Sequence, residues 1–193
     1  MTQLFGEFNE HLPPSQEYLA LQFSPSSVPL QQRWKNNGLS ADFMAYYLMS
    51  FFPSHEKDPE AIAKHQEIKG AVSYIANELL ENAMKFNDET SQLPISISLQ
   101  LHADKLVFLT TNAIPPQSLA DFQTYIQELT TSEPEELYIR QLEKNAEDDT
   151  NTSSRLGFLT MMNDYLAKVG WKFEFVQKEP EVITVTTMVQ LAV

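Results

Sequence analysis

Three polar side chains at helical spacing, Glu78, Asn82 and Lys85, are the residues of this sequence best placed to do chemistry. Positions i, i+4 and i+7 lie on one face of an α-helix, so a carboxylate, an amide and an ammonium group form a row. Such a row can be a solvated helix edge. It can also be one wall of a site for an anionic ligand with a divalent cation. The spacing by itself leaves both interpretations open.

The sequence around this row predicts one long helix. Asp58 and Pro59 form a typical helix start, because aspartate caps the first amides and proline fits the first turn. The helical pattern continues to about Phe86. At about 100° per residue, an apolar stripe lies beside the polar row and predicts a core-facing side. It consists of Val72, Ile75, Ala76, Leu79, Leu80, Ala83 and Phe86.

Strands and further helices are predicted by alternation and by helix-end signals. Residues 94–101 alternate and predict a strand, and residues 106–112 follow a short turn as its paired strand, which predicts a β-hairpin. Residues 1–17 predict a loosely docked lead-in, and residues 145–154 a mobile loop. We also expect strands at 18–23, 171–176 and 182–191, and helices at 29–36, 40–52, 115–129, 134–144 and 156–169, with Ser40 as an N-cap and Gly170 as a helix end.

The order of these elements predicts a two-layer α/β sandwich, with helices on one face of a mixed, mostly antiparallel sheet. Residues 58–193 form this domain, and residues 1–57 are an N-terminal extension packed on it. The helix at 40–52 is rich in aromatic and methionine side chains. It either packs into the core or forms a dimer or partner surface, since these residue types favour interfaces.

Composition excludes several functional classes. The net charge of −13 argues against a nucleic-acid or anionic-membrane surface, which needs basic patches. The absence of cysteine excludes disulfides, thiolate metal sites and a cysteine nucleophile. No apolar run approaches the roughly 18 residues of a membrane span, so we expect a soluble cytoplasmic protein. The chain has only 5 glycines, although loops that bind phosphate normally contain several.

The stretch Glu-Leu-Leu-Glu-Asn-Ala-Met-Lys-Phe at 78–86 resembles the N-box of the GHKL ATPase superfamily. Gyrase, MutL and histidine kinases belong to this superfamily, and its fold is called the Bergerat fold. The element order expected after residue 58 is also the order of that fold. The resemblance implies that Asn82 holds Mg²⁺ against the triphosphate of ATP. It also implies that Glu78 is a general base or orients water, and that Lys85 lies near the phosphates.

The first glycine motif of the family is altered. Ile114-Pro-Pro keeps the Ile-Pro-Pro of histidine kinases, but the place of the adenine-binding aspartate falls on Leu109 and both glycines are replaced. Thr110 or Asn112 can supply an oxygen acceptor in its place, less strongly than a carboxylate. The alternative is that these residues are only a polar strand end.

The second glycine motif corresponds to residues 152–158 and keeps one glycine, Gly157. Amides at the N-terminus of the following helix can still hold a phosphate, and Ser154 can cap that helix. Three roles are open for Arg155: it contacts the phosphates, it fills the space that they need, or it is only a surface side chain of a lid. Without the other glycines, a close approach of the backbone to a ligand is costly.

Residues 136–146, 153–165 and 170–174 resemble one branch of this superfamily, bacterial and cyanobacterial histidine-kinase-like regulators related to anti-sigma-factor serine kinases. The resemblance covers roughly residues 60–192. It implies cytoplasmic signalling and a protein partner such as a STAS-type antagonist, a sigma factor or a phosphatase. His55 and His65 are the only nearby phospho-acceptor candidates, and both are better explained as surface or core histidines.

Three functions remain open at this point. The first is a regulator with a degenerate ATP-binding fold that acts by binding a protein partner. The second is an ATP- and Mg²⁺-dependent serine/threonine kinase, with Glu78 as base and Asn82 on the metal. The third is a ligand-free, dimeric interaction module. The intact row at 78–85 favours retained nucleotide binding, whereas the altered glycine motifs favour its loss.

Overall fold

The computed structural model describes residues 2–24, 37–52, 58–147, 155–179 and 181–193. Six strands form one sheet in the order β1-β5-β6-β4-β3-β2, and every pairing is antiparallel. The strands are β1 (Thr2–Gly6), β2 (Glu17–Phe23), β3 (Ile95–Leu101), β4 (Lys105–Ile114), β5 (Lys168–Lys178) and β6 (Glu181–Ala192).

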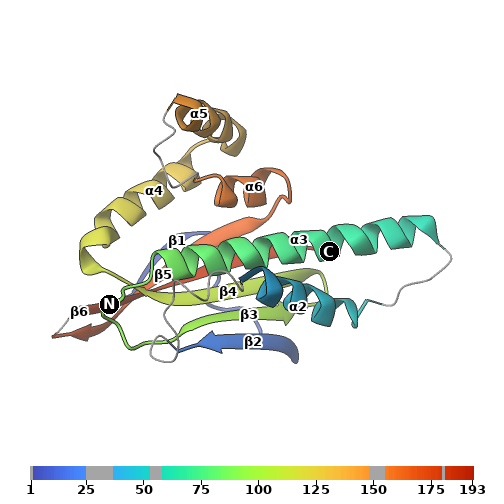
Figure 1. Ribbon diagram of the computed structural model, residues 1–193, viewed down its shortest axis with the longest axis horizontal. Coiled ribbons are helices and arrows are strands. Elements are labelled where there is room, and N and C mark those ends of the chain that lie inside the picture. The colour runs from blue at the N-terminus through green and yellow to red at the C-terminus, as the bar shows by residue number, and fades with distance from the viewer. Residues whose placement is uncertain (1, 25–36, 53–57, 148–154, 180) are drawn as a thin grey trace.

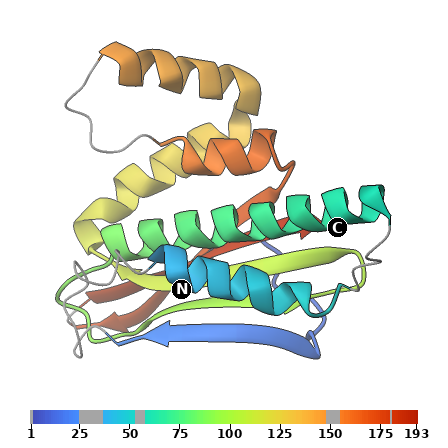
Figure 2. The same cartoon turned by 45° about the vertical axis from the view of Figure 1, so that its right-hand side comes forward.

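The helices lie on one face of this sheet (Figures 1 and 2), which confirms the two-layer α/β sandwich. On that face, helices α2 and α3 cover the half of the sheet that contains β2, β3 and β4, whereas α4 and α6 cover the half that contains β1 and β5. Helix α5 lies farthest from the sheet. The helices are α2 (Asn37–Met49), α3 (Pro59–Lys85), the short 3₁₀ turn η2 (Pro116–Ser118), α4 (Leu119–Thr131), α5 (Pro134–Glu147) and α6 (Gly157–Asn163). The predicted helix at 29–36 lies outside the described residues.

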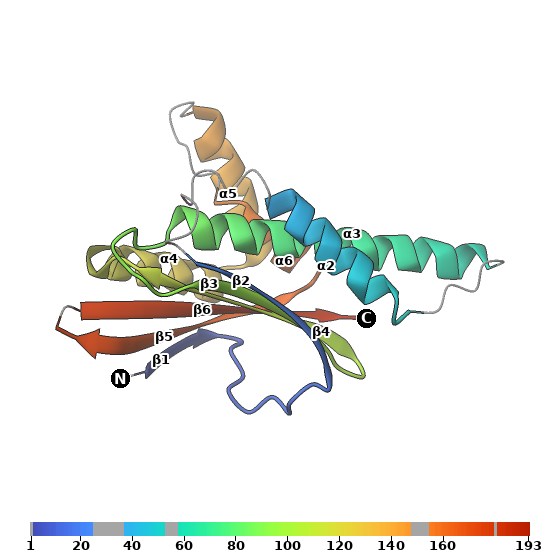
Figure 3. The same cartoon turned by 60° about the horizontal axis from the view of Figure 1, so that its bottom comes forward.

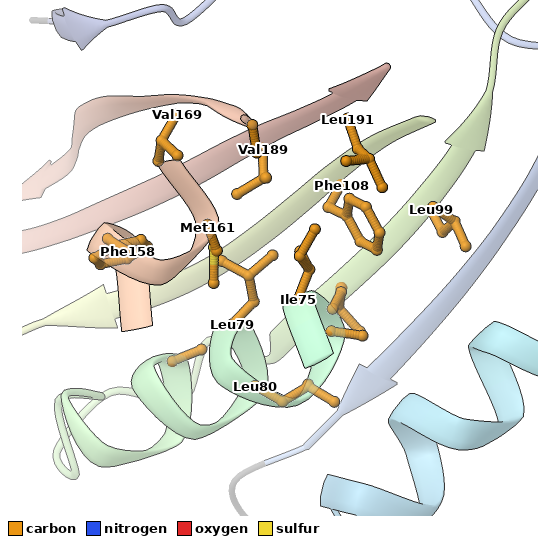
Figure 4. Packing of buried hydrophobic residues seen from close by; sticks show 14 of the residues in the cluster. Ile75, Leu79, Leu80, Leu99, Phe108, Phe158, Met161, Val169, Val189 and Leu191 are labelled. Carbon is orange, nitrogen blue, oxygen red and sulfur yellow. The ribbon is translucent and has the colours of Figure 1, made fainter. Parts of the chain in front are cut away.

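Helix α3 is the predicted long helix. Its N-cap is Asp58, whose carboxylate accepts a hydrogen bond from the Glu60 amide at 3.0 Å. The predicted apolar stripe is buried from Val72 to Ala83. Figure 4 shows Ile75 beneath Phe108, as part of the core between the helix and the sheet. Full burial of each such aliphatic side chain contributes about 1.5–3 kcal/mol.

Phe86 does not belong to the buried stripe, although the helical pattern placed it there. It is the C-cap of α3, and 47% of its surface is exposed. Its backbone leaves the helical conformation, with φ −104° and ψ 9°. The periodicity of a helix no longer decides the direction of a side chain once the helix has ended.

The prediction of a loosely docked lead-in was wrong. Residues 2–6 pair with β5 at one edge of the sheet, and the next strand, β2, pairs with β3 at the opposite edge. The connecting segment crosses the face of the sheet that carries no helices (Figure 3). There Gln190 donates a hydrogen bond to the Glu7 carbonyl at 2.9 Å. Strands from the predicted extension and from residues 58–193 thus share one sheet.

The prediction of a helix over 156–169 was also wrong, because the helix ends much earlier. Helix α6 stops at Asn163, Leu166 has a left-handed φ of 51°, and β5 begins at Lys168. The alternation of Val169, Trp171 and Phe173, all buried, is that of a strand with one face in the core. Gly170 is therefore a strand residue and not a helix end.

Gly170 permits the crossing of the N-terminal segment. A Cβ atom at this position would run into the backbone of Glu7 and Phe8, so no side chain fits between β5 and the crossing chain. Gly6, which pairs with Gly170, has a φ of +61° and turns the chain off the sheet edge.

Helix α2 confirms core packing for one side of the aromatic segment, whereas a dimer or partner surface on its other side stays a prediction. The described helix already includes Asn37, so Ser40 is not its N-cap. One side of α2 is buried against α3 and consists of Ala41, Met44, Ala45, Leu48 and Met49. The opposite side is exposed and consists of Leu39, Phe43, Tyr46 and Tyr47, followed by Phe51. We call these five residues the α2 stripe.

Candidate functional site

A cavity of about 560 Å³ opens between α3, α4, the start of α6 and strands β4 and β6. This volume is within the roughly 300–1,000 Å³ of small-molecule sites. One wall is polar and comes from α3, whereas α4 and β6 supply apolar side chains that include Phe122, Tyr125 and Val185. The cavity thus combines a few polar groups with aromatic surface, as ligand sites usually do.

The structure brings the predicted site residues together in this cavity. Seven of the eight line it, namely Glu78, Asn82, Lys85, Thr110, Asn112, Arg155 and Gly157. The eighth, Ser154, lies outside the described residues. The row on α3 therefore lines a cavity, with Glu78 and Asn82 half-buried and Lys85 exposed, while the role of each side chain stays a prediction.

Glu78 lies against the start of α6. A Cβ atom at position 157 would collide with the Glu78 carboxylate, so a larger residue there would require that side chain to move. Burial, together with the nearby Glu81 carboxylate, raises the pKa of Glu78. The Glu78 carboxylate consequently lies at the end of the cavity where the resemblance implied phosphate. The helix that begins there, α6, has only 7 residues.

Strand β4 supplies the floor of the cavity through alternate residues. Phe108, Thr110 and Asn112 are buried on the helix side, and the side chain between the last two, Thr111, bonds to Thr186 at 2.9 Å on the far face. Leu109, where the family aspartate would fall, is also on that far face by the same alternation and does not line the cavity. The oxygen atoms available on this strand are those of Thr110 and Asn112.

The Thr110 hydroxyl is the most unusual polar group of the floor. Thr110 is 2% exposed, and its Oγ1 is buried without a hydrogen-bond partner among the described residues. The neighbouring Asn112 is better satisfied, because its Nδ2 donates to the Ala113 carbonyl at 2.9 Å. Leaving a buried hydroxyl unpaired costs about 1–3 kcal/mol.

Asn87 lines the cavity as well and was missed by the sequence analysis. Its Nδ2 donates to the Asp88 carbonyl at 2.9 Å, but its buried Oδ1 has no partner among the described residues. The amide of Asp88 bonds to the Ala113 carbonyl at 2.9 Å and ties this turn to β4. The sequence placed Asn87 in a segment that merely ends the helix, and nothing there indicated that its side chain turns inward.

Arg155 packs on the aromatic side of the cavity. Its guanidinium lies 5.2 Å from the centroid of the Tyr125 ring, and the Tyr125 hydroxyl donates to the Arg155 carbonyl at 3.1 Å. The backbone of Arg155 is left-handed, with φ 53°. Burial raises the pKa of Tyr125, so this hydroxyl stays protonated and keeps its donor role.

The charges around the cavity are mixed and slightly acidic. The charged side chains among its described lining residues are three carboxylates, Glu78, Glu81 and Asp121, and two cations, Lys85 and Arg155. Within the part of the chain that the structure describes, no three histidine, aspartate or glutamate side chains gather closely enough to bind a metal ion. A divalent cation would need ligands from a bound phosphate in addition to Asn82.

The fold and the site define a two-layer α/β sandwich with a polar and aromatic cavity beneath its longest helix. A search of solved structures finds the same fold in a chain of the crystal structure of the SiaB–SiaC complex from Pseudomonas aeruginosa. The match has a TM-score of 0.51 at 12% sequence identity, and covers 91% of this chain and 89% of that one. At this identity the likeness establishes the fold alone.

Sequence comparison adds no family. A scan of protein-family models finds no match, and a search of curated proteins finds no matching sequence. Among the described helices, none has both the length and the apolar composition that a membrane span requires.

Proposed function

We propose that the protein is a cytoplasmic signalling regulator that acts by binding another protein, and that its GHKL-like fold binds ATP–Mg²⁺ weakly or not at all. The observation that carries this proposal is the α2 stripe. Candidate partners are those that the family resemblance implies: a STAS-type antagonist, a sigma factor or a phosphatase.

The α2 stripe has the composition of a protein-binding surface. Leu39 and Tyr46 are 74% and 64% exposed, although α2 is held firmly by its other side. Ser73 of α3 bonds to Asp42 at 2.7 Å, and the Lys69 ammonium lies 3.5 Å from the centroid of the Tyr46 ring. Contiguous exposed apolar residues mark interaction sites, and aromatic residues are enriched in them.

A different protein is a better occupant of this surface than a second copy. Each copy carries a net charge of −13, so two copies repel each other at long range. The structure with a similar fold is a complex of two proteins, SiaB and SiaC, which also favours a heterologous partner. A homodimer is the alternative, and it predicts twice the monomer mass in solution.

The cavity favours weak binding of ATP–Mg²⁺. Its three carboxylates outnumber its two cations, and the Glu78 carboxylate lies against Gly157, in the motif where the resemblance implied phosphate contacts. No carboxylate on β4 faces the position expected for adenine. Asn82 is the one predicted metal ligand, so phosphate oxygens of ATP would have to supply the others.

The test compares two double variants with the same chemistry. Phe43→Asp with Tyr46→Asp changes the α2 stripe, and Ile139→Asp with Leu142→Asp changes exposed apolar residues of α5. Tagged proteins are purified from the native cell, and bound proteins are identified by mass spectrometry. We expect one partner to be retained by the wild type and the α5 variant and lost from the stripe variant. Retention by the stripe variant, or equal loss from both, would contradict the proposal.

An ATP-dependent serine/threonine kinase is the second candidate, because Glu78, Asn82 and Lys85 do meet in one cavity. In this function the substrate hydroxyl would take the γ-phosphoryl group of ATP with release of ADP, and the Glu78 carboxylate would accept the hydroxyl proton. Its raised pKa improves it as a base near neutral pH. Transfer of labelled phosphate to the captured partner, lost in Glu78→Gln, would establish the kinase. Absence of phosphate transfer at saturating ATP would exclude the kinase function.

A further inference from the structure

The two edges of the sheet differ in how they are covered. At one edge, α4 packs against the five-residue strand β1, and Gln123 of α4 donates a hydrogen bond to the Gln3 side chain at 2.6 Å. At the other edge, Figures 1 and 2 show β2 as the outermost strand on the side of α2. Within the described part of the chain, the backbone of residues 18–22 pairs with β3 alone. The outer edge of β2 is therefore open.

Strand β2 also lacks the features that normally protect an open edge. Natural sheets block their edges with charged side chains, proline, bulges or short strands, because the free amide and carbonyl groups would otherwise pair with another chain. Residues 18–22, Tyr-Leu-Ala-Leu-Gln, contain no charge and no proline, and their register with β3 is unbroken. The free backbone groups of this edge are thus arranged to pair with a further extended segment.

The side chains of β2 restrict what that segment carries. Leu19 and Leu21 lie on the helix side of the sheet and pack against the core, whereas Tyr18 on the opposite face is 62% exposed. Facing residues of neighbouring strands lie on the same face, so a strand beside β2 places every second side chain next to the two leucines. A segment with apolar residues at alternate positions would extend the core across this edge.

A hollow connects the edge of β2 with the α2 stripe. Its volume is about 500 Å³, and it is lined by Glu17, the first residue of β2, and by Phe51, the last residue of the stripe. Phe52 and Leu101 line it as well. A protein bound on the stripe can consequently place an extended segment along β2 through one continuous surface.

The charges at this edge favour a basic segment over a second copy of the chain. Strands β2 and β3 and helix α2 contain two carboxylates, Glu17 and Asp42, and neither lysine nor arginine. Lys69 of α3 lies at the border of this region, beside the Tyr46 ring. Two copies with a net charge of −13 each repel one another, whereas a segment with lysine or arginine is attracted.

We propose that the outer edge of β2 binds an extended segment of the partner protein as an added strand, with apolar side chains at alternate positions and basic residues at its ends. Backbone hydrogen bonds supply the affinity, while Leu19, Leu21 and Glu17 supply the specificity. The inference rests on the proposed function, because it names the part of the partner that binds beside the α2 stripe.

A blocked model peptide, Lys-Val-Thr-Val-Thr-Val-Lys, tests the edge by hydrogen exchange and mass spectrometry. At about 1 mM, which half-fills a site of that dissociation constant, it should slow exchange in β2 and leave β1 unchanged. The same peptide N-methylated at every internal residue should give no protection, because it has lost the backbone donors of both its edges. Replacing both lysines by glutamate should weaken binding about fivefold or more. No protection of β2 by the basic peptide, or equal protection by the methylated one, would overturn the proposal.

Two matched double variants locate the bound peptide. Ala20→Lys with Gln22→Lys adds two cations to exposed positions of β2, and Thr2→Lys with Leu4→Lys does the same on β1. Charged side chains hinder pairing at an edge, so the β2 variant should bind the basic peptide about tenfold more weakly while the β1 variant binds it as the wild type does. Equal affinities of the two variants count against the inference, and circular dichroism checks that each is folded. A dimer in sedimentation that the β2 variant dissociates would assign the edge to a second copy and also overturn the proposal.

The protein captured in the stripe experiment, once purified, separates this inference from the proposed function. In the complex it should slow hydrogen exchange in β2 as well as in α2. If α2 is protected and β2 is not, the inference fails and the regulator function stands. If no protein is captured although the basic peptide protects β2, the regulator function fails and the edge of β2 remains a peptide-binding surface.

Discussion

The substitution Thr110→Val should make the protein more stable. The hydroxyl of Thr110 is buried and has no hydrogen-bond partner in the part of the chain that the structure describes, and valine has nearly the same shape without the hydroxyl. Removing an unsatisfied buried hydroxyl recovers its desolvation cost of about 1–3 kcal/mol. Valine also favours strands at least as well as threonine does. For a chain of this length, each kcal/mol raises the melting temperature by about 2–4 °C.

Thr111→Val is the matched control for this prediction. It makes the same change one residue further along β4, but Thr111 bonds to the Thr186 hydroxyl at 2.9 Å. Losing that hydrogen bond should lower the free energy of unfolding by about 0.5–1.5 kcal/mol. The two variants should therefore shift the melting temperature in opposite directions.

Thermal and urea unfolding, followed by circular dichroism without ligand, measure both variants. The urea midpoint should move with the melting temperature, while the slope of the unfolding free energy against urea concentration stays unchanged. That combination would show that stability changed and that the surface exposed on unfolding did not. A Thr110→Val variant that unfolds at a lower temperature than the wild type would refute the reasoning. It would mean that the hydroxyl has a partner that the packing of β4 does not reveal.

Two other changes test the N-terminal crossing and the buried carboxylate. Gly170→Ala should lower the melting temperature and expose the N-terminal segment to proteases, because a methyl group there collides with the backbone of Phe8. Gly70→Ala, in open space on α3, should instead stabilise by about 0.5–1 kcal/mol, and equal effects of the two would contradict the crossing. Glu78→Gln should stabilise the protein near neutral pH, since the pKa of Glu78 is raised by burial and by Glu81. The ionised carboxylate begins to destabilise the fold as pH rises above its unfolded-state pKa, and the destabilisation is complete above its folded-state pKa. The gain in melting temperature from Glu78→Gln should therefore vanish in acid. A gain that is constant with pH would refute this.

The helix that carries the site could be predicted from sequence because its signals are local. The cap at Asp58 and the periodic burial of Leu79 and Leu80 depend only on neighbours along the chain. The convergence of Glu78, Asn82 and Thr110 on one cavity was expected from the family resemblance and not from spacing. Helix periodicity places the first two on one face, but only the tertiary fold brings β4 beneath them.

The features that sequence missed depend on distant parts of the chain. The N-terminal strand is defined by backbone pairing with β5, about 170 residues away, and its own composition is too polar to indicate a strand. Gly170 looks like a helix end, and only the crossing of Phe8 explains why the position must be glycine. Asn87 follows the end of α3, where the inward direction of a side chain is decided by the turn and not by periodicity.

Titration of the purified protein with ATP–Mg²⁺, wild type beside Asn82→Ala, tests the central claim most directly. We predict a dissociation constant of about 1 mM or weaker, equivalent to about −4 kcal/mol or less favourable, that the substitution changes little. Micromolar binding by the wild type that is abolished in Asn82→Ala would contradict the account and establish a working nucleotide site.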